Sequence, residues 1–309
     1  MKVLVKTAKM PREEWLRWRT NGIGGSDASV IFGTNPYRSI FHLWMEKTGQ
    51  LEPEERGTEY THFGTVLESV VKQEFIRRTG LKVRAKRALL QSDEYPFMLA
   101  DLDGVIYEDG MMNIFEAKTA SEYKRDIWEE GVPEEYVLQV QHYMSVTGAK
   151  RTYIAALVGG NHFVYHVVER DENLIAEIIR KEKEFWERNV LQGEEPLADG
   201  SKATTEYLNV RYGKSGGGTI VLPTEALALC DSYDVLSGQI KALEEEKDAV
   251  ANQLKNYLKE NEVGIIGDRK VTWKQITAKG FDKKRLEKEN KEVYEAYLIT
   301  NSYRKLSVA

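Results

Sequence analysis

Glu116 and Lys118, separated by a single alanine, combine a carboxylate and an ammonium group at a spacing that suits catalysis. They end the strand-like run Asn113–Lys118, and side chains two residues apart on a strand point to the same face. Asp103 lies on an earlier acidic strand and can reach the same place. Two carboxylates beside a lysine can hold Mg²⁺ against a phosphate and stabilise the charge of an attacked phosphodiester. These three residues therefore outline a nuclease site.

Glu68 is a candidate fourth member of this site. It falls in a predicted helix over 59–79, on the side that Val71 and Phe75 share. Its carboxylate either extends to solvent at the edge of the apolar stripe or turns into an interior polar site. Gly64, one turn earlier, would let the helix pack closely over a sheet, which favours the interior site.

Two glutamines could face the same site from a predicted helix that follows Pro133 and ends at Gly148. Gln141 lies at the edge of that helix's apolar stripe. Gln139 is more than a right angle away and shares its side with Tyr143. An amide in a core-facing position needs hydrogen-bond partners. A metal-bound water, a phosphate or a backbone group would each serve, so both glutamines are candidates.

A glycine-rich turn, Gly24-Gly25-Ser26, opens another predicted helix. Backbone N–H groups at the start of a helix form a natural cradle for a phosphate. Arg19, at the end of the preceding predicted helix, could clamp the same phosphate. The alternative role of Ser26 is that of a helix N-cap.

The composition is that of an ordinary globular protein. The 309 residues are 41% apolar and 30% charged, and no segment approaches the roughly 18 uninterrupted apolar residues of a membrane span. A single cysteine, Cys230, excludes an internal disulfide and a four-cysteine metal site. The net charge of −5 argues against a passive DNA-coating protein, but a nuclease can confine its basic residues to one groove. We therefore expect a cytoplasmic protein that does not contact the membrane.

The pattern along the chain predicts a central mixed sheet flanked by helices, an α/β (α+β) fold. Strand-like runs occur at 82–90, 97–107, 112–118, 151–158 and 162–168. Helical patterns occur at 11–19, 26–32, 40–48, 59–79, 121–130, 133–148 and 171–191. Glu108-Asp109-Gly110 is a plausible hairpin turn. These elements place Asp103, Glu116 and Lys118 on neighbouring strands.

The composition shifts after the last of these helices and predicts three segments. A core over 1–195 is followed by a linker or long loop over 196–222, in a region rich in Gly, Ser and Thr. A helical arm and a small α/β tail occupy 223–309. The tail is predicted as a strand at Lys270–Ile276, a helix at Asp282–Leu298 and a strand at Tyr303–Val308.

The arm has the pattern of one long helix from about Pro223 to Asn261. Its apolar residues fall at heptad-like spacing, with Lys247 interrupting the stripe. They are Ile240, Leu243, Val250, Leu254 and Tyr257. The pair Ser237-Gly238 is predicted to mark a break. The pattern favours a coiled-coil arm or a helical hairpin.

Several short motifs occur in a fixed order along residues 10–170, and two more follow in the tail. They are Trp15–Arg19, Gly22–Ala28, Phe63–Glu68, Asp101–Gly104, Glu116–Lys118 and Gln139–Tyr143, with Val271–Lys274 and Ser302–Leu306 in the tail. The ordered set resembles the YqaJ-like viral recombinase family, relatives of phage lambda exonuclease within the PD-(D/E)xK nuclease superfamily. The resemblance implies a restriction-endonuclease-like core, over 1–195 in this chain.

Carried over by position, the resemblance implies a role for each candidate. Asp103 and Glu116 would be direct metal ligands, Glu68 would join them through metal-bound water, and Lys118 would be the catalytic lysine. Gln141, or Gln139 in an alternative alignment, would orient the nucleophile or the substrate. Arg19, Ser26 and Gly25 would belong to a pocket for the 5′-terminal phosphate.

The chain departs from the family pattern in two places. The "PD" element reads Leu102-Asp103 here, so Asp101 competes with Asp103 for the ligand role. The long arm after residue 223 is absent from the compact lambda enzyme.

The activity implied is that of a Mg²⁺-dependent 5′-to-3′ exonuclease of double-stranded DNA, in which Mn²⁺ substitutes for Mg²⁺. It would leave 3′ single-stranded tails for phage-type homologous recombination in the cytoplasm of a bacterial host. A ring-shaped homo-oligomer, a trimer, and a single-strand annealing protein as partner are also implied. The alternatives are an endonuclease or structure-selective nuclease with the same site, and a non-catalytic DNA-binding recombination scaffold.

Overall fold

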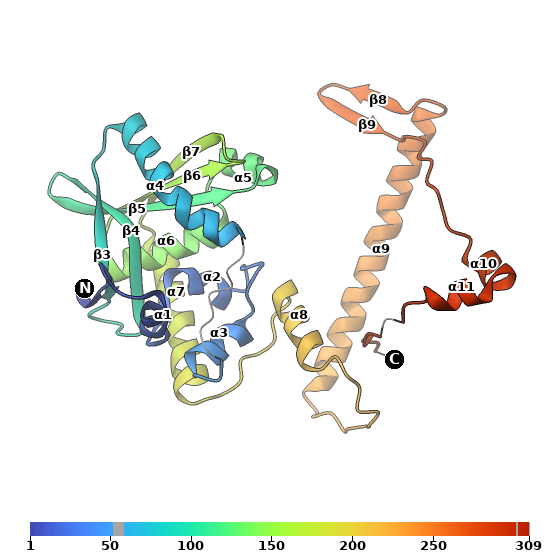
Figure 1. Cartoon of the computed structure of the whole chain (residues 1–309), viewed down its shortest axis with the longest axis horizontal. Coiled ribbons are helices and arrows are strands. Elements are labelled where there is room, and N and C mark those ends of the chain that lie inside the picture. Colours follow the sequence, from blue (N-terminus) through green and yellow to red (C-terminus); the bar gives the residue numbers. More distant parts are fainter. Residues whose placement is uncertain (52–58, 301, 309) are drawn as a thin grey trace. The chain divides into compact units, whose positions relative to one another are not determined.

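The computed structural model describes residues 1–51, 59–300 and 302–308, and the chain divides into two compact units, Met1–Arg211 and Tyr212–Ala309. The centre of the first unit is a seven-stranded mixed sheet (Figure 1). Its strands are β1 (Lys2–Lys6), β2 (Ile23–Gly24), β3 (Val83–Gln91), β4 (Met98–Glu108), β5 (Met111–Ala120), β6 (Arg151–Val158) and β7 (His162–Glu169). They lie in the order β1-β3-β4-β5-β6-β7, with β2 parallel to β4. Five strands follow the predicted runs, whereas β1 and β2 were missed.

Helices cover both faces of this sheet, and further helices pack on them in turn. They are α1 (Arg12–Thr20), α2 (Gly25–Ile31), α3 (Ile40–Lys47), α4 (Glu59–Thr79), α5 (Arg125–Glu130), α6 (Glu134–Thr147), α7 (Glu172–Glu184) and α8 (Lys202–Arg211). The two that pack on other helices are α3 and α8. A 3₁₀ turn, Glu122–Lys124, precedes α5, and a π-helical segment, Phe185–Leu191, follows α7.

Two of the three apolar clusters in the described residues hold helices on the faces of the sheet, and the third packs α2 and α3 against the π-helical segment. On one face, α4 buries Val71 and Phe75 against Phe115 of β5. On the other face, α2, α6 and α7 share a larger core with the sheet, which includes Met144 of α6 and Ile154 of β6. Since neighbouring residues on β5 point to opposite faces, Phe115 faces α4 while Glu116 faces α6.

β4 and β5 separate at the point where the polar residues lie. Their ladder joins Gly104–Glu108 to Met111–Phe115 and goes no further. Beyond it, β5 continues beside β6 as far as Ala120, while the first half of β4 pairs with β2 and β3. β5 and β6 are parallel and need a crossover, which places α6 over the gap between the strands.

The hairpin turn between β4 and β5 confirms the predicted Glu108-Asp109-Gly110 turn. Asp109 and Gly110 both have a positive φ, of 51° and 79°. Aspartate and glycine tolerate this conformation best, and such two-residue turns match the twist of paired strands. The turn fixes the register of β4 and β5, and so sets Asp103 across from Glu116.

The described part of the second unit contains a long helix, a hairpin and two short helices. They are α9 (Ala226–Leu258), β8 (Val263–Ile266), β9 (Arg269–Thr272), α10 (Lys283–Glu289) and α11 (Lys291–Ala296). The predicted long helix is confirmed. The predicted break at Ser237-Gly238 is wrong, because α9 runs through both residues; a single glycine costs a helix about 1 kcal/mol without ending it.

The predicted tail differs from the structure in three ways. The strand expected at Lys270–Ile276 is the short β9, which pairs with β8, a strand that was missed. The helix expected at Asp282–Leu298 is divided at Asn290, whose side chain caps α11. The strand expected at Tyr303–Val308 is absent from residues 302–308, where no other strand supplies hydrogen bonds for it.

The segment expected to be a linker over 196–222 contains α8. Tyr207 of α8 stacks on Phe41 of α3 with ring centroids 4.8 Å apart, and Ala203 is buried. This packing extends the first unit to Arg211. Among the described helices, none is both long enough and apolar enough to cross a lipid bilayer.

Candidate active site

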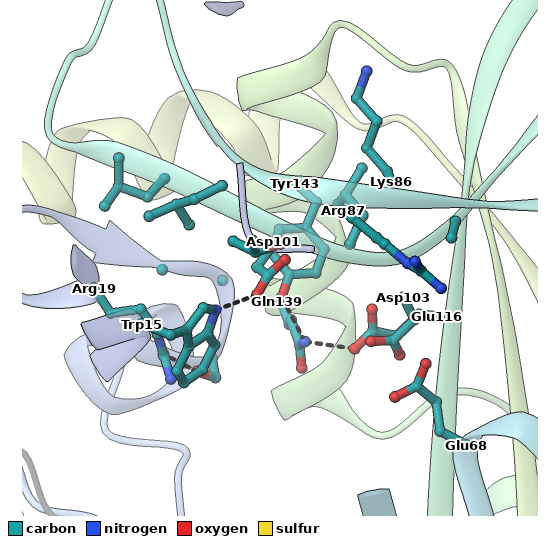
Figure 2. A pocket seen from close by; sticks show the side chains of 18 of the residues that line it. Trp15, Arg19, Glu68, Lys86, Arg87, Asp101, Asp103, Glu116, Gln139 and Tyr143 are labelled. Carbon is teal, nitrogen blue, oxygen red and sulfur yellow. Dashed lines mark hydrogen bonds between the residues drawn. The ribbon is translucent and has the colours of Figure 1, made fainter. Parts of the chain in front are cut away.

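Three carboxylates meet where β4 and β5 separate. Asp103 comes from β4, Glu116 from β5 and Glu68 from α4, and all three line one cavity of about 520 Å³ (Figure 2). The backbone N–H of Ala117 donates a 2.9 Å hydrogen bond to Asp103 Oδ2, which replaces the ladder bond lost where the strands part. The structure thus brings together the acidic residues that the sequence predicted.

Glu116 is the most deeply buried of the three, with 3% of its side chain exposed. Burial raises its pKa to about 8, and the negative charge of Asp103 adds to the effect. Burial likewise raises the pKa of Asp103, and burial followed by the charge of Asp103 raises that of Glu68. Without a cation, all three carboxyl groups therefore hold a proton more readily than they would in water.

Lys118 and Gln139 fix one oxygen of Glu116. Lys118 Nζ lies 2.8 Å from Glu116 Oε1 and donates a 3.0 Å hydrogen bond to Gln139 Oε1. Gln139 Nε2 donates to the same Glu116 oxygen at 2.7 Å and to the hydroxyl of Tyr143 at 3.1 Å. Burial lowers the pKa of Lys118, but Glu116 and Asp103 outweigh it, so the net shift is upward and the ammonium stays charged.

The other oxygen of Glu116, Oε2, is buried and has no hydrogen-bond partner within the described residues. A buried carboxylate oxygen without a partner is costly, and a divalent cation would satisfy it. No group of three or more His, Cys, Asp or Glu side chains in those residues is arranged to hold a metal ion. A cation bound by Asp103 and Glu116 would take its remaining ligands from water and substrate oxygens, as Mg²⁺ commonly does. The residues present fit such an ion.

Gln141, the other glutamine candidate, does not join the cluster. Its Nε2 donates a 2.8 Å hydrogen bond to the carbonyl of Glu169, and its Oε1 accepts one of 3.0 Å from the N–H of Asp171. It thus ties α6 to the chain between β7 and α7. Since Gln139 and Gln141 point in different directions from α6, only Gln139 reaches Glu116.

The second end of the cavity is lined by Arg19, Gly25 and Ser26. Arg19 Nη2 donates a 2.9 Å hydrogen bond to Ser26 Oγ. The N-cap of α2 is Gly24, so the N-cap alternative for Ser26 is wrong and its hydroxyl faces Arg19 instead. Figure 2 shows Arg19 at one end of the cavity and Glu68 at the other.

Asp27 forms ion pairs with basic residues at the Arg19 end of the cavity, a role that the sequence analysis did not predict. Its fully buried carboxylate lies 2.8 Å from both Lys47 and Arg38, and 3.7 Å from Arg19. Burial by itself raises the pKa of Asp27, but Lys47, Arg38 and Arg19 together hold it far below its usual range. Of these three cations, Arg19 lines the cavity, where Arg12 is a second basic side chain, while Arg38 also pairs with Glu46.

Gly25 allows α2 to approach α6. A Cβ atom at this position would lie 2.5 Å from the ring of Tyr143, a contact that side chains do not tolerate. Tyr143 thus packs on Gly25 at one end of the cavity and bonds Gln139 at the other. The phosphate-binding and acidic candidates are parts of one packed unit.

Asp101 and Asp103, which compete for the ligand role, take different positions. Asp101 Oδ2 accepts a 2.6 Å hydrogen bond from Trp15 Nε1, which turns it toward α1, and Figure 2 shows it between Trp15 and Gln139. Asp103 alone lies beside Glu116. This placement favours Asp103 as the ligand.

Further basic side chains line the cavity. They are Arg12, Lys72, Lys86 and Arg87. Lys86 and Arg87 are consecutive, so a regular strand would point them to opposite faces. The register of β3 against β4 shifts on both sides of Lys86, and such a bulge re-aims side chains. The sequence of β3 alone does not predict this bulge, because it is defined by the register of β3 against β4.

Known proteins resemble this chain in sequence and fold. Residues 14–150 match the family model of the YqaJ-like viral recombinase domain. The uncharacterized protein YqaJ of Bacillus subtilis (strain 168) is 40% identical over 310 residues, which cover 99% of this chain and 97% of that protein.

Two solved structures share the fold. An alkaline exonuclease (LHK-Exo) from Laribacter hongkongensis superposes with a TM-score of 0.50 at 21% identity, over 65% of this chain and 98% of that one. The complex of LHK-Exo with dAMP gives a TM-score of 0.50 at 22% identity, with the same coverage. These likenesses confirm the predicted fold class, a central mixed sheet flanked by helices.

Proposed function

The chain belongs to the YqaJ-like viral recombinase family, and on that premise we propose that it is a metal-dependent deoxyribonuclease of phage-type recombination. It digests linear double-stranded DNA from the 5′ end and leaves 3′ single-stranded tails. The observation that carries the proposal is a single cavity that holds Asp103 and Glu116 at one end and Arg19 and Ser26 at the other. Opposite charges at the two ends suit a cation on one side and a terminal phosphate on the other.

Asp103 and the free oxygen of Glu116 would hold the cation, with Glu68 as an outer carboxylate. The ion, Mg²⁺ with Mn²⁺ as a substitute, supplies charge to the scissile phosphate and lowers the pKa of a bound water. Because Glu116 Oε1 is already occupied by Lys118 and Gln139, its Oε2 is the oxygen available for binding.

Lys118 and Gln139 would act beside the attacked phosphate. The charged Lys118 ammonium stabilises the negative charge that grows on the phosphate, or positions the attacking water. Gln139 holds both Lys118 and Glu116 in place through its amide. Gln141, bonded to backbone groups elsewhere, takes no part.

Arg19, Ser26 and Gly25 would bind the 5′-terminal phosphate and so make cleavage depend on a DNA end. A guanidinium group and a hydroxyl are common donors to phosphate oxygens, and Gly25 leaves room for the backbone to approach. A site that needs a terminal phosphate cannot engage a closed circle. The ring-shaped trimer, the annealing partner and the bacterial cytoplasm are carried over from family membership alone.

The test is digestion of a 5′-phosphorylated linear duplex beside a closed circle of the same sequence, with and without Mg²⁺ and with Mn²⁺ in parallel. We expect metal-dependent loss of the linear DNA alone. Cleavage of the circle would show an endonuclease instead. If neither DNA is cut with either metal, a non-catalytic scaffold is favoured.

Matched variants connect the activity to the cavity. Lys118→Ala should abolish digestion while DNA binding remains, whereas Lys124→Ala should leave digestion unchanged, because Lys124 pairs with Glu135 outside the cavity. Arg19→Ala should remove the preference for a 5′-phosphate over a 5′-hydroxyl end. Arg17→Ala, an exposed change on the same helix, is its control.

A further inference from the structure

The helix α9 carries an uncovered apolar seam of unusual regularity. Every third or fourth residue, in strict alternation, falls on one line along the helix. These residues are Leu229, Tyr233, Leu236, Ile240, Leu243, Lys247, Val250, Leu254 and Tyr257. Eight of the nine are apolar, and those eight are between 42% and 84% exposed. An amphipathic helix in water is stabilised chiefly by packing its apolar face, so this seam calls for a partner.

The repeat of the seam limits what that partner can be. Spacings that alternate between three and four average 3.5 residues, and only another helix with the same repeat stays in contact with such a seam as the two supercoil. Among the described helices, the other two of this unit, α10 and α11, are 7 and 6 residues long, too short to cover 33 residues. A second α9 has both the length and the repeat.

We propose that α9 pairs with α9 of a second copy of this chain as a parallel, in-register, two-stranded coiled coil. In heptad terms, Ile240 and Lys247 take position a, and Leu236 and Leu243 take position d. Around Ile240, a β-branched residue at a lies between leucines at d, the combination that favours two parallel strands, whereas Val250 at d and Leu254 at a do not follow it. The inference concerns this arm and is independent of the nuclease activity.

Lys247 specifies the register. In a parallel pair, a side chain at position a packs against the residue at position g of the other helix, the residue just before that helix's own position a. Here that residue is Glu246. The Lys247 ammonium of each copy therefore meets the Glu246 carboxylate of the other. A shift by one heptad would place the two lysines against apolar layers, so the in-register pair is selected.

The test is site-specific disulfide formation in the full-length chain. Cys230 is first replaced by serine, and a single cysteine is then introduced as Val250→Cys on the seam or Asn252→Cys on the outer face. Residues at d face each other in a parallel pair, and a disulfide requires such proximity. Mild oxidation should join the Val250→Cys chains into a reducible dimer and leave the Asn252→Cys chains largely monomeric on a denaturing gel.

The proposal is overturned if Val250→Cys forms no more crosslinked dimer than Asn252→Cys. Oligomers formed through the nuclease unit alone need not bring two copies of residue 250 together, so they would not produce the expected difference. A second variant gives an independent reading. Leu243→Glu places a carboxylate in the seam and should lower the molar mass in sedimentation by separating the paired copies, whereas Glu245→Ala on the outer face should not. An unchanged mass for Leu243→Glu also counts against the seam.

Discussion

At the scale of single residues, the two carboxylate oxygens of Glu116 have different surroundings. Oε1 accepts from Lys118 and Gln139, which fixes the carboxylate in place. Oε2 is buried and bonded to nothing among the described residues. A fixed ligand with one free oxygen is preorganised for a cation, and the cost of burying its charge is offset when either a proton or a cation binds.

The raised pKa of Glu116, about 8, makes cation binding depend on pH. The metal-free folded protein holds a proton on Glu116 more tightly than the unfolded chain does, so its stability falls as pH rises from about 4.3 toward 8. Below pH 8 a cation must displace this proton. We therefore expect the rise in melting temperature caused by Mg²⁺ to grow with pH and to level off above pH 8, as measured by differential scanning fluorimetry.

Glu116→Gln is the control for this titration. It removes the group that titrates, so the Mg²⁺-induced shift should be small at every pH. A wild-type shift that is equally large at pH 6 and pH 9 would contradict the assignment of the free oxygen as a ligand.

The two glutamines on α6 should respond to alanine in opposite ways. Gln139→Ala releases Lys118 and Glu116 and should lower kcat by roughly 10- to 100-fold, the range seen for residues that orient metal ligands. Gln141→Ala removes two hydrogen bonds to backbone groups and should cost about 1–3 kcal/mol of stability with little change in kcat. Urea denaturation and single-turnover digestion of both variants separate the two effects, and a reversed pattern would restore Gln141 as the candidate.

At the scale of elements, most of the sheet and its helices follow from the local sequence pattern. The features that the sequence analysis missed depend on contacts with residues far away in the chain. Asp103, Glu116 and Lys118 could be predicted because spacing two on a strand fixes a common face. The choice between Gln139 and Gln141 could not, because it depends on where the crossover from β5 to β6 sets α6. The same holds for Lys86 and Arg87, which only the bulge of β3 against β4 brings to one cavity.

Two glycines in helices should behave in opposite ways when a methyl group is added. Gly25→Ala drives a Cβ to 2.5 Å from the Tyr143 ring, and such overpacking costs about 1–3 kcal/mol. Gly238→Ala meets nothing within 4 Å on the exposed α9 and should stabilise that helix by roughly 0.5–1 kcal/mol. Urea denaturation of Gly25→Ala, and circular dichroism of Gly238→Ala followed with temperature, check the pair. Stabilisation by Gly25→Ala would contradict the close packing of α2 on α6.

At the scale of the whole molecule, every residue proposed for the chemistry lies in the first unit, Met1–Arg211, and none lies in the second. The coiled-coil seam belongs entirely to the second unit. The boundary between the two could not be predicted from composition. The residues after 195 look like a linker, and only the contact of Tyr207 with Phe41, far apart in the chain, shows that α8 belongs to the core.

A chain ended after Arg211 should fold and digest linear DNA, since the cavity and the three apolar clusters are complete without the second unit. A chain ended after residue 195, the boundary suggested by composition, loses α8 and exposes Phe41. It should be less stable by more than about 2 kcal/mol, the scale of uncovering one large aromatic side chain. Thermal unfolding and digestion of both fragments provide the measurement. Equal stability of the two would show that α8 contributes nothing to the core.

The ring of Tyr143 joins the two ends of the cavity, since it packs on Gly25 and bonds Gln139, which in turn holds Glu116. Packed atoms thereby fix the distance between two places. One is where the terminal phosphate is proposed to bind, and the other is where the phosphodiester bond is proposed to break. An enzyme built in this way would measure from the end before it cuts. Its products would then share one length whatever the sequence of the DNA, and a looser contact at Tyr143 would show itself as a mixture of lengths rather than as a slower reaction.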